Sequence, residues 1–166
     1  MDLCLVGSEM CIRDSSKISY SKNVFKNENL DTPAIKYQNE NGEYLEISWN
    51  SLKQKTLEIQ EILINNNIKI GDRVVGYCSN TPEVIAAFLA TNSLGAIWSS
   101  CSPDFGYDSV LDRFKQLQPK FLFYHSNYLY NGKEFSLDSK VSNLKKSIKS
   151  ISYTLDLNTK SQFSTV

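Results

Sequence analysis

The sequence lacks an excess of charge of either sign, and it has a single histidine. Among its 166 residues, Lys and Arg number 18 and Asp and Glu number 18, so the formal net charge is zero. A balanced charge gives no sign of a nucleic-acid-binding surface or of an acidic disordered tail, and we expect no nucleic-acid partner. No two of the four cysteines have Cys-x-x-Cys spacing, and one histidine leaves a zinc site short of ligands. We therefore expect free thiols in a reducing cytoplasm.

Long hydrophobic runs are also lacking. A membrane-spanning helix needs roughly 18 to 20 predominantly apolar residues in succession. The longest apolar-rich stretch, 84–98, is interrupted by Thr91, Asn92, Ser93 and Gly95. The start of the chain has no basic segment and only a short apolar run, which is unlike a signal peptide. We expect a cytoplasmic protein without a membrane span.

Residues 1–15, MDLCLVGSEMCIRDS, have no helical or strand periodicity of useful length. They resemble a translated sequencing-adapter segment that recurs at the ends of unrelated proteins. We interpret them, with Cys4 and Cys11, as a non-native leader and exclude them from the fold. The alternative is a genuine disordered leader, which would also have no functional content.

The first half of the remaining chain predicts a hairpin, a helix, a strand and a second helix. Residues 34–37 and 44–48 are β-prone and flank Asn41-Gly42, a strong turn signal. Helical spacing follows over 49–66, with Ser48 as the N-cap. A short buried strand is expected at 73–77. The next helix begins at Pro82, behind a Thr81 cap, and ends before Gly95.

The second half continues the alternation. We expect a strand at 96–100, a loop at 102–106, a helix at 108–117, a strand at 121–124, a polar loop, a helix near 137–148 and a strand near 151–155. Strands that alternate with helices imply a parallel sheet with right-handed crossovers. The fold class is therefore α/β: a front β-hairpin followed by a doubly wound parallel-sheet subdomain.

The turn at 78–82 could hold a phosphate only weakly. It contains no glycine, although dinucleotide-binding turns need glycines for close backbone approach. The helix N-terminus at Thr81 could attract an anion, but capping of the helix is the favoured role.

Nucleophilic and metal chemistry are the other candidates. His125 follows a predicted strand, so it could pair with Cys101 or a neighbouring serine at the next strand end. The simpler interpretation makes His125 a half-exposed edge residue and Cys101 a small core residue. Asp108 and Asp112 share a helix face, but acids are expected near a helix start, and we predict no metal site.

Three blocks of the chain resemble acyl-CoA synthetases of the adenylate-forming superfamily. The longest is GDRVVGYCSNTPEVIAAFLATNSLGAIWSSCSPDFG, at 71–106. Its last part, with SVLDRFKQLQPKFLF after it, is specifically similar to acetoacetyl-CoA synthetases. The upstream segment DTPAIKYQNENGEYLEISWNSL and the downstream segment NYLYNGKEF also resemble these enzymes, so the similarity covers about 20–155.

The resemblance implies a ligase that joins acetoacetate to CoA. Such enzymes use ATP to form an acyl-adenylate and pyrophosphate, then pass the acyl group to CoA and release AMP, with Mg²⁺ assisting at the phosphates. The family's phosphate loop, adenine and ribose motifs and catalytic lysine do not occur in the sequence. We therefore expect residues 16–166 to be part of the N-terminal domain, an N-terminal fragment that is inactive alone and poorly stable, with no catalytic residue to assign.

The resemblance also implies contacts to CoA. The loop formed by Ser102, Pro103, Asp104 and Phe105 matches one that lies near the CoA path in related enzymes. Lys133 matches a basic residue that contacts the nucleotide phosphate of CoA. A second basic residue, three places earlier in close relatives, is replaced here by tyrosine at 130, which leaves the lysine alone.

Two alternatives remain open. The chain could belong to an acetyl- or propionyl-CoA synthetase, which would share the fold. It could also be a complete, non-catalytic α/β binding module, in which case residues 1–15 would be genuine.

Overall fold

A computed structural model describes residues 18–26, 29 and 31–160. The predicted leader at 1–15 lies outside the described residues. The helices are α2 (Tyr20–Lys26), α3 (Trp49–Asn65), α4 (Pro82–Ser93), α5 (Tyr107–Leu117), α6 (Asp138–Ser147) and α7 (Leu157–Lys160). The strands are β1 (Ile35–Gln38), β2 (Tyr44–Ile47), β3 (Arg73–Tyr77), β4 (Ile97–Cys101), β5 (Phe121–Tyr124), β6 (Asn127–Tyr130), β7 (Lys133–Ser136) and β8 (Tyr153–Asp156).

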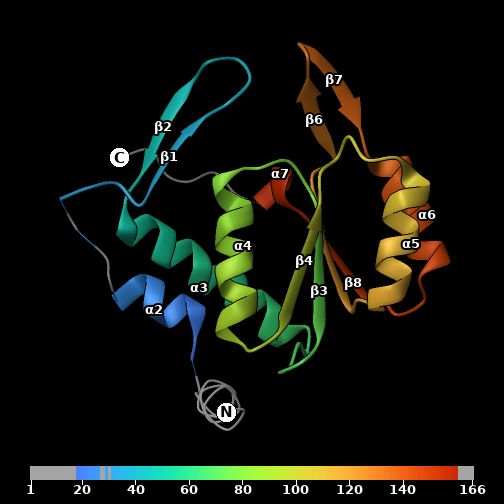
Figure 1. The fold of residues 1–166 in the computed structure, drawn as a ribbon, viewed down its shortest axis with the longest axis horizontal. Helices are drawn as coiled ribbons and strands as arrows, with labels where there is room; N and C mark the ends of the chain where they lie inside the picture. The colour runs from blue at the N-terminus through green and yellow to red at the C-terminus, as the bar shows by residue number, and fades with distance from the viewer. Residues whose placement is uncertain (1–17, 27–28, 30, 161–166) are drawn as a thin grey trace, which may run out of the picture.

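A four-stranded parallel sheet forms the centre of the molecule. Its strand order is β4-β3-β5-β8, so the chain moves outward from β3 to β4 and then returns to place β5 on the other side of β3. Helices α2, α3 and α4 lie on one side of the sheet, and α5 and α6 lie on the other (Figure 1). This arrangement confirms the predicted doubly wound α/β fold.

The two sides of the sheet carry separate hydrophobic cores, because successive side chains of a strand point to opposite faces. Val74 and Phe123 pack with α3 and α4. Val75, Tyr77 and Leu122 pack with α5 and α6. Because helices cover both faces of the sheet, the sequences of the central strands are nearly continuous apolar runs.

The β1–β2 hairpin confirms the prediction from Asn41-Gly42, with Ile35 paired to Ile47. The predicted polar loop after β5 was wrong, since this segment forms a second hairpin, β6–β7. Asn131 and Gly132 connect its strands with φ angles of 52° and 72°. Two consecutive positive φ angles are typical of the tight turns that match the twist of a hairpin, and Asn-Gly is their preferred sequence.

The helix starts differ in how they are capped. Ser48 caps α3 as predicted, because its side chain accepts a hydrogen bond from the Ser51 N–H. Thr81 occupies the N-cap position of α4, but its side chain makes no capping bond, so the predicted side-chain role was wrong. Helix α2 was not predicted, and β8 begins two residues later than expected.

Candidate functional site

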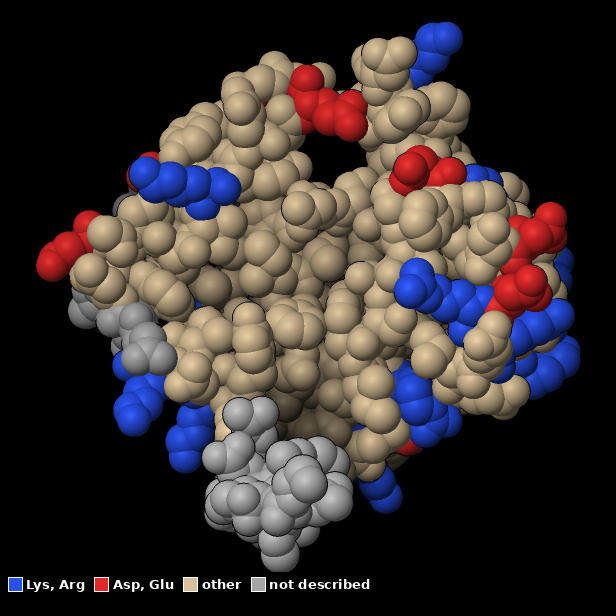
Figure 2. Space-filling model, in the orientation of Figure 1, with Lys and Arg blue, Asp and Glu red and all other residues tan. Residues whose placement is uncertain are grey.

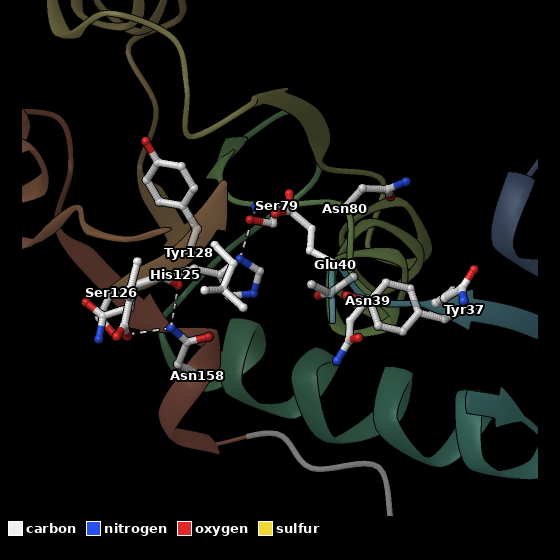
Figure 3. Close-up of a pocket in the computed structure, with 14 residues that line it drawn as sticks. Tyr37, Asn39, Glu40, Ser79, Asn80, His125, Ser126, Tyr128 and Asn158 are labelled. Atoms are coloured by element: carbon white, nitrogen blue, oxygen red, sulfur yellow. Dashed lines mark hydrogen bonds between the residues drawn. The ribbon is translucent and has the colours of Figure 1, made fainter. Parts of the chain in front are cut away.

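The carboxyl ends of β3 and β5 form the topological switch point of the sheet. The chain leaves these adjacent strands in opposite directions, which opens a crevice where α/β proteins bind ligands. A cavity of about 780 Å³ lies there. It is lined by residues 37–40 from β1 and its turn, 79–81 after β3, 125–126 after β5, parts of hairpin β6–β7, and Asn158 of α7 (Figure 3).

His125 forms part of the cavity wall. Only 3% of its surface is exposed, so the expectation of a half-exposed edge residue was wrong. Its Nδ1 accepts a hydrogen bond from the Ser79 N–H at 3.0 Å (Figure 3). An accepting Nδ1 carries no proton, so the neutral imidazole has its proton on Nε2. Burial lowers the pKa of His125, and the nearby Asp156 carboxylate opposes that shift.

A hydrogen-bond network fixes the neighbouring strand ends. The Asp156 carboxylate at the end of β8 accepts bonds from the Ser126 N–H at 3.1 Å and the Asn158 N–H at 2.9 Å. The Asn158 side chain donates to the Asn127 carbonyl at 3.0 Å. The base of hairpin β6–β7 is closed by a bond from the Leu137 N–H to the Ser126 carbonyl. These contacts hold one wall of the cavity rigidly on the sheet.

The cavity has an acidic character. Its lining contains Glu40 and Glu134 and no lysine or arginine. Acidic side chains border the hollow between the two hairpins in Figure 2. Burial, with Glu83 and Glu40 nearby, raises the pKa of Tyr37, as expected for a phenol in a negative field. An anionic group would therefore be repelled from this cavity.

The predicted loop of Ser102, Pro103, Asp104 and Phe105 follows β4 at the same edge of the sheet. Pro103 is buried, while the other three side chains are exposed. The buried Tyr77 hydroxyl donates to the Phe105 carbonyl at 2.8 Å and lies 3.3 Å from the Pro103 carbonyl. Burial is the main cause that raises the pKa of Tyr77 to about 12, so the phenol stays protonated and can donate.

Lys133 is the first residue of β7, next to the Asn131-Gly132 turn. It pairs with Tyr130 across the hairpin, and both are exposed. Hairpin β6–β7 extends beyond the carboxyl edge of the sheet (Figure 1). Tyr77, whose hydroxyl contacts the predicted loop, belongs to the core against which Tyr128 of β6 packs, so the loop lies near the hairpin base. Lys133 lies about 7 Å further along, at two residues of strand rise.

The other sequence candidates do not form sites. Cys101 is buried as predicted, within the core that faces α5 and α6, and its Sγ lies 3.7 Å from an Arg113 nitrogen. Nδ1 of His125 is used by Ser79, and no hydrogen bond among the described residues joins His125 to Cys101 or to a serine side chain. The described residues contain no group of three or more His, Cys, Asp and Glu placed to hold a metal ion.

Sequence reasoning identified His125 but missed most of its surroundings. Tyr37, Glu40 and Asn158 reach the cavity from segments far apart in the chain. For Asn158 the available signal was its position just after a strand of the parallel sheet, whereas Tyr37 and Glu40 belong to the separate hairpin β1–β2. Which of them meet depends on the strand order, and that order is not written in any local pattern.

Residues 22–165 match the protein family described as AMP-binding enzyme. The chain belongs to the AMP-binding enzyme family. In the described part of the chain, no helix is long and apolar enough to cross a membrane.

The chain is similar in sequence to several synthetases and in fold to a solved acetoacetyl-CoA synthetase. The acetoacetyl-CoA synthetase of Gallus gallus is 43% identical over 121 residues, which are 72% of this chain and 18% of that protein. A malonamoyl-CoA synthetase of Penicillium aethiopicum is 39% identical over 87 residues, 52% of this chain and 12% of that protein. The structure of acetoacetyl-CoA synthetase from Streptomyces lividans matches with a TM-score of 0.78 and 31% identity, over 87% of this chain and 23% of that one. The chain thus spans about a fifth of the length of the acetoacetyl-CoA synthetases it matches.

Proposed function

We propose that this chain is the early part of the N-terminal domain of an acetoacetate–CoA ligase. The observation that carries the proposal is its 38–43% identity to acetoacetyl-CoA synthetases from animals and a bacterium. The match to the fold of the Streptomyces lividans enzyme supports it. Residues 16–166 would form the domain segment, and residues 1–15 a leader outside it.

The proposed reaction joins acetoacetate and CoA at the expense of ATP. The carboxylate of acetoacetate attacks the α-phosphorus of ATP, which forms an acyl-adenylate and releases pyrophosphate. The CoA thiolate then attacks the acyl carbon and AMP leaves. Mg²⁺, when bound, would supply neutralisation of the phosphate charge, and no residue of this chain is assigned to hold it. The residues of this chain are assigned to binding and not to bond-making, and we expect the 166-residue chain alone to form no acyl-adenylate.

The substrate is tested on a complete ligase that contains this segment. We expect pyrophosphate release to be fastest with acetoacetate, compared with acetate, propionate and malonamate. Malonamate belongs in the panel because the similarity includes a malonamoyl-CoA synthetase. Faster pyrophosphate release with acetate or propionate would indicate an acetyl- or propionyl-CoA synthetase instead. No release with any of the acids would reject ligase activity.

Lys133 is the proposed contact to the nucleotide phosphate of CoA. It is an exposed cation on a hairpin that extends from the ligand-binding edge of the sheet, and the Ser102, Pro103, Asp104 and Phe105 loop lies near the base of that hairpin. A lysine in this position can act as a mobile point charge toward a phosphate. The loop would contact the less charged part of CoA.

Lys133→Ala in the complete ligase should raise KM for CoA about fivefold, which corresponds to the loss of about 1 kcal/mol from one exposed charge pair. KM for ATP should not change. Lys149→Ala, which removes an exposed lysine just after α6, is the matched control. An equal KM for CoA in the Lys133 variant and the wild type would reject this contact.

A further inference from the structure

The cavity at the switch point contains polar groups that have no protein partner. Only 3% of the surface of His125 is exposed, and its Nε2 makes no hydrogen bond to any described residue. The hydroxyl of Ser79 and the amide of Asn80 also make no recorded bond within the described part of the chain, and both line the same cavity. Nε2 is not among the fully buried unpaired side-chain atoms of the described residues, so it is open to the cavity, where a ligand or water can accept from its N–H.

Two of the other polar side chains around the cavity are already occupied. The Asn39 side chain accepts from the Asn41 and Glu43 N–H groups. The Asn158 amide nitrogen donates to the Ser126 hydroxyl and the Asn127 carbonyl. Unoccupied polar groups remain where the turn after β3 meets His125, and they include the buried Thr81 hydroxyl. Figure 3 shows Ser79 and His125 there, with Asn80 and Glu40 beside them.

The charges of the lining restrict the ligand. The cavity has two carboxylates and no basic side chain, so a phosphate or a carboxylate would enter against a like charge. Other groups of the lining are neutral, and they include the imidazole of His125, hydroxyls and the phenols of Tyr37 and Tyr128. Hydroxyl groups of a ligand suit this set, because each can accept from Nε2–H or an amide and donate to a carboxylate or an amide oxygen.

We propose that this cavity is a binding site for a neutral, hydroxyl-rich small molecule, such as a sugar or another polyol. Nε2–H of His125 donates to one ligand hydroxyl oxygen. Ser79 and Asn80 bond the neighbouring hydroxyl groups, and Glu40 accepts a ligand O–H at the rim. Tyr37 and Tyr128 supply apolar ring surface for the ligand carbons. This site is separate from the CoA contacts at Lys133, and it does not depend on the proposed ligase activity.

His125 is the single histidine of the chain, so its imidazole signals can report ligand binding without overlap from another histidine. The full 166-residue chain is prepared without a histidine tag, and the imidazole resonances of His125 are followed by NMR during titration with glucose, ribose or xylitol. We expect at least one neutral polyol to shift them saturably, at concentrations up to the order of 10 mM. Glucose 6-phosphate should bind at least about tenfold more weakly than glucose because of the acidic lining.

Two variants test the assignment to named groups. Asn80→Ala should weaken polyol binding about fivefold, the effect of one hydrogen bond lost from an exposed amide. Asn143→Ala removes an exposed amide on α6, on the other side of the sheet, and should leave binding unchanged. Three results would overturn the proposal: no shift with any neutral polyol, a preference for the phosphorylated sugar, or binding of glucosamine without binding of glucose, which would make the ligand a cation.

Discussion

At the scale of single residues, His125 joins two strand ends through one hydrogen bond. Its Nδ1 accepts from the Ser79 N–H, so a proton on Nδ1 would face another donor. Burial disfavours the imidazolium and lowers the pKa of His125 in the folded chain. Asp156 acts in the opposite direction but does not reverse the shift. The fold therefore requires a neutral imidazole at this position.

The free energy of unfolding should consequently fall as the pH is lowered through the ordinary histidine pKa of 6.5. The unfolded chain takes up a proton at this pH, whereas the folded chain resists it, so protonation favours the unfolded state. Above that pH both states are neutral and the effect disappears. Urea unfolding between pH 5.5 and 7.5 would measure the slope.

His125→Gln is the matched variant for this slope. Glutamine can accept from Ser79 through its amide oxygen and does not titrate. Its overall stability can differ from the wild type without affecting the comparison, because the readout is the pH dependence. An unchanged slope in the glutamine variant would assign the pH dependence to other groups.

The residue scale also shows what sequence reasoning could and could not reach. The lone histidine after a predicted strand was recognised, because strand ends are visible in the periodicity. Its burial was not, because Ser79, which bonds the imidazole, lies 46 residues away in the chain. Burial of a side chain at a strand end depends on its neighbours in the sheet, and a local pattern does not contain them.

At the scale of elements, the two central helices begin in physically different ways. Ser48 caps α3 with its side chain at 3.1 Å from the Ser51 nitrogen. Thr81 stands before α4, where the Thr81 hydroxyl is buried and has no partner among the described residues. Pro82 at the start of α4 lacks an N–H and fixes φ in the helical range, which reduces the need for a side-chain cap.

Ser48→Ala should therefore lower the free energy of unfolding by about 1 kcal/mol, the usual cost of a lost N-cap. Thr81→Val should leave it unchanged or raise it by up to about 1 kcal/mol, because valine has a similar shape and removes an unpaired buried hydroxyl. Urea unfolding of the two variants provides the comparison. A loss in Thr81→Val as large as in Ser48→Ala would show that both hydroxyls cap their helices.

The accuracy of the predicted elements followed the strength of local signals. Strands at 73–77 and 121–124 had the correct bounds, and the helix between Pro82 and Gly95 was confirmed. Hairpin β6–β7 was missed although Asn131-Gly132 is the same signal as Asn41-Gly42, because its short strands are mostly exposed and show little alternation between buried and exposed residues. Helix α2 was missed because packing stabilises it, including the ring contact between Tyr20 and Phe88.

At the scale of the whole molecule, both faces of the sheet are covered but its edges are not. No described strand pairs with the outer side of β4 or of β8. Ile97 on β4 is 51% exposed and Tyr153 on β8 is 37% exposed. Unpaired backbone groups beside apolar side chains favour pairing with another chain. The sheet edges are therefore where we expect the separate chain to associate.

We expect the 166-residue chain to self-associate through the β4 edge, and Ile97→Lys to reduce this association. A lysine on an edge strand keeps its charge in water and opposes strand pairing with a second copy. Because the Ile97 side chain is already half exposed, the free energy of unfolding should change by no more than about 0.5 kcal/mol. Sedimentation velocity across a range of protein concentrations would measure the association. Ile64→Lys is the control, since Ile64 is 53% exposed and the variant adds the same charge on helix α3 instead of on the edge strand. Equal association of the two variants would mean that the gain in charge, and not the β4 edge, controls the behaviour of the chain.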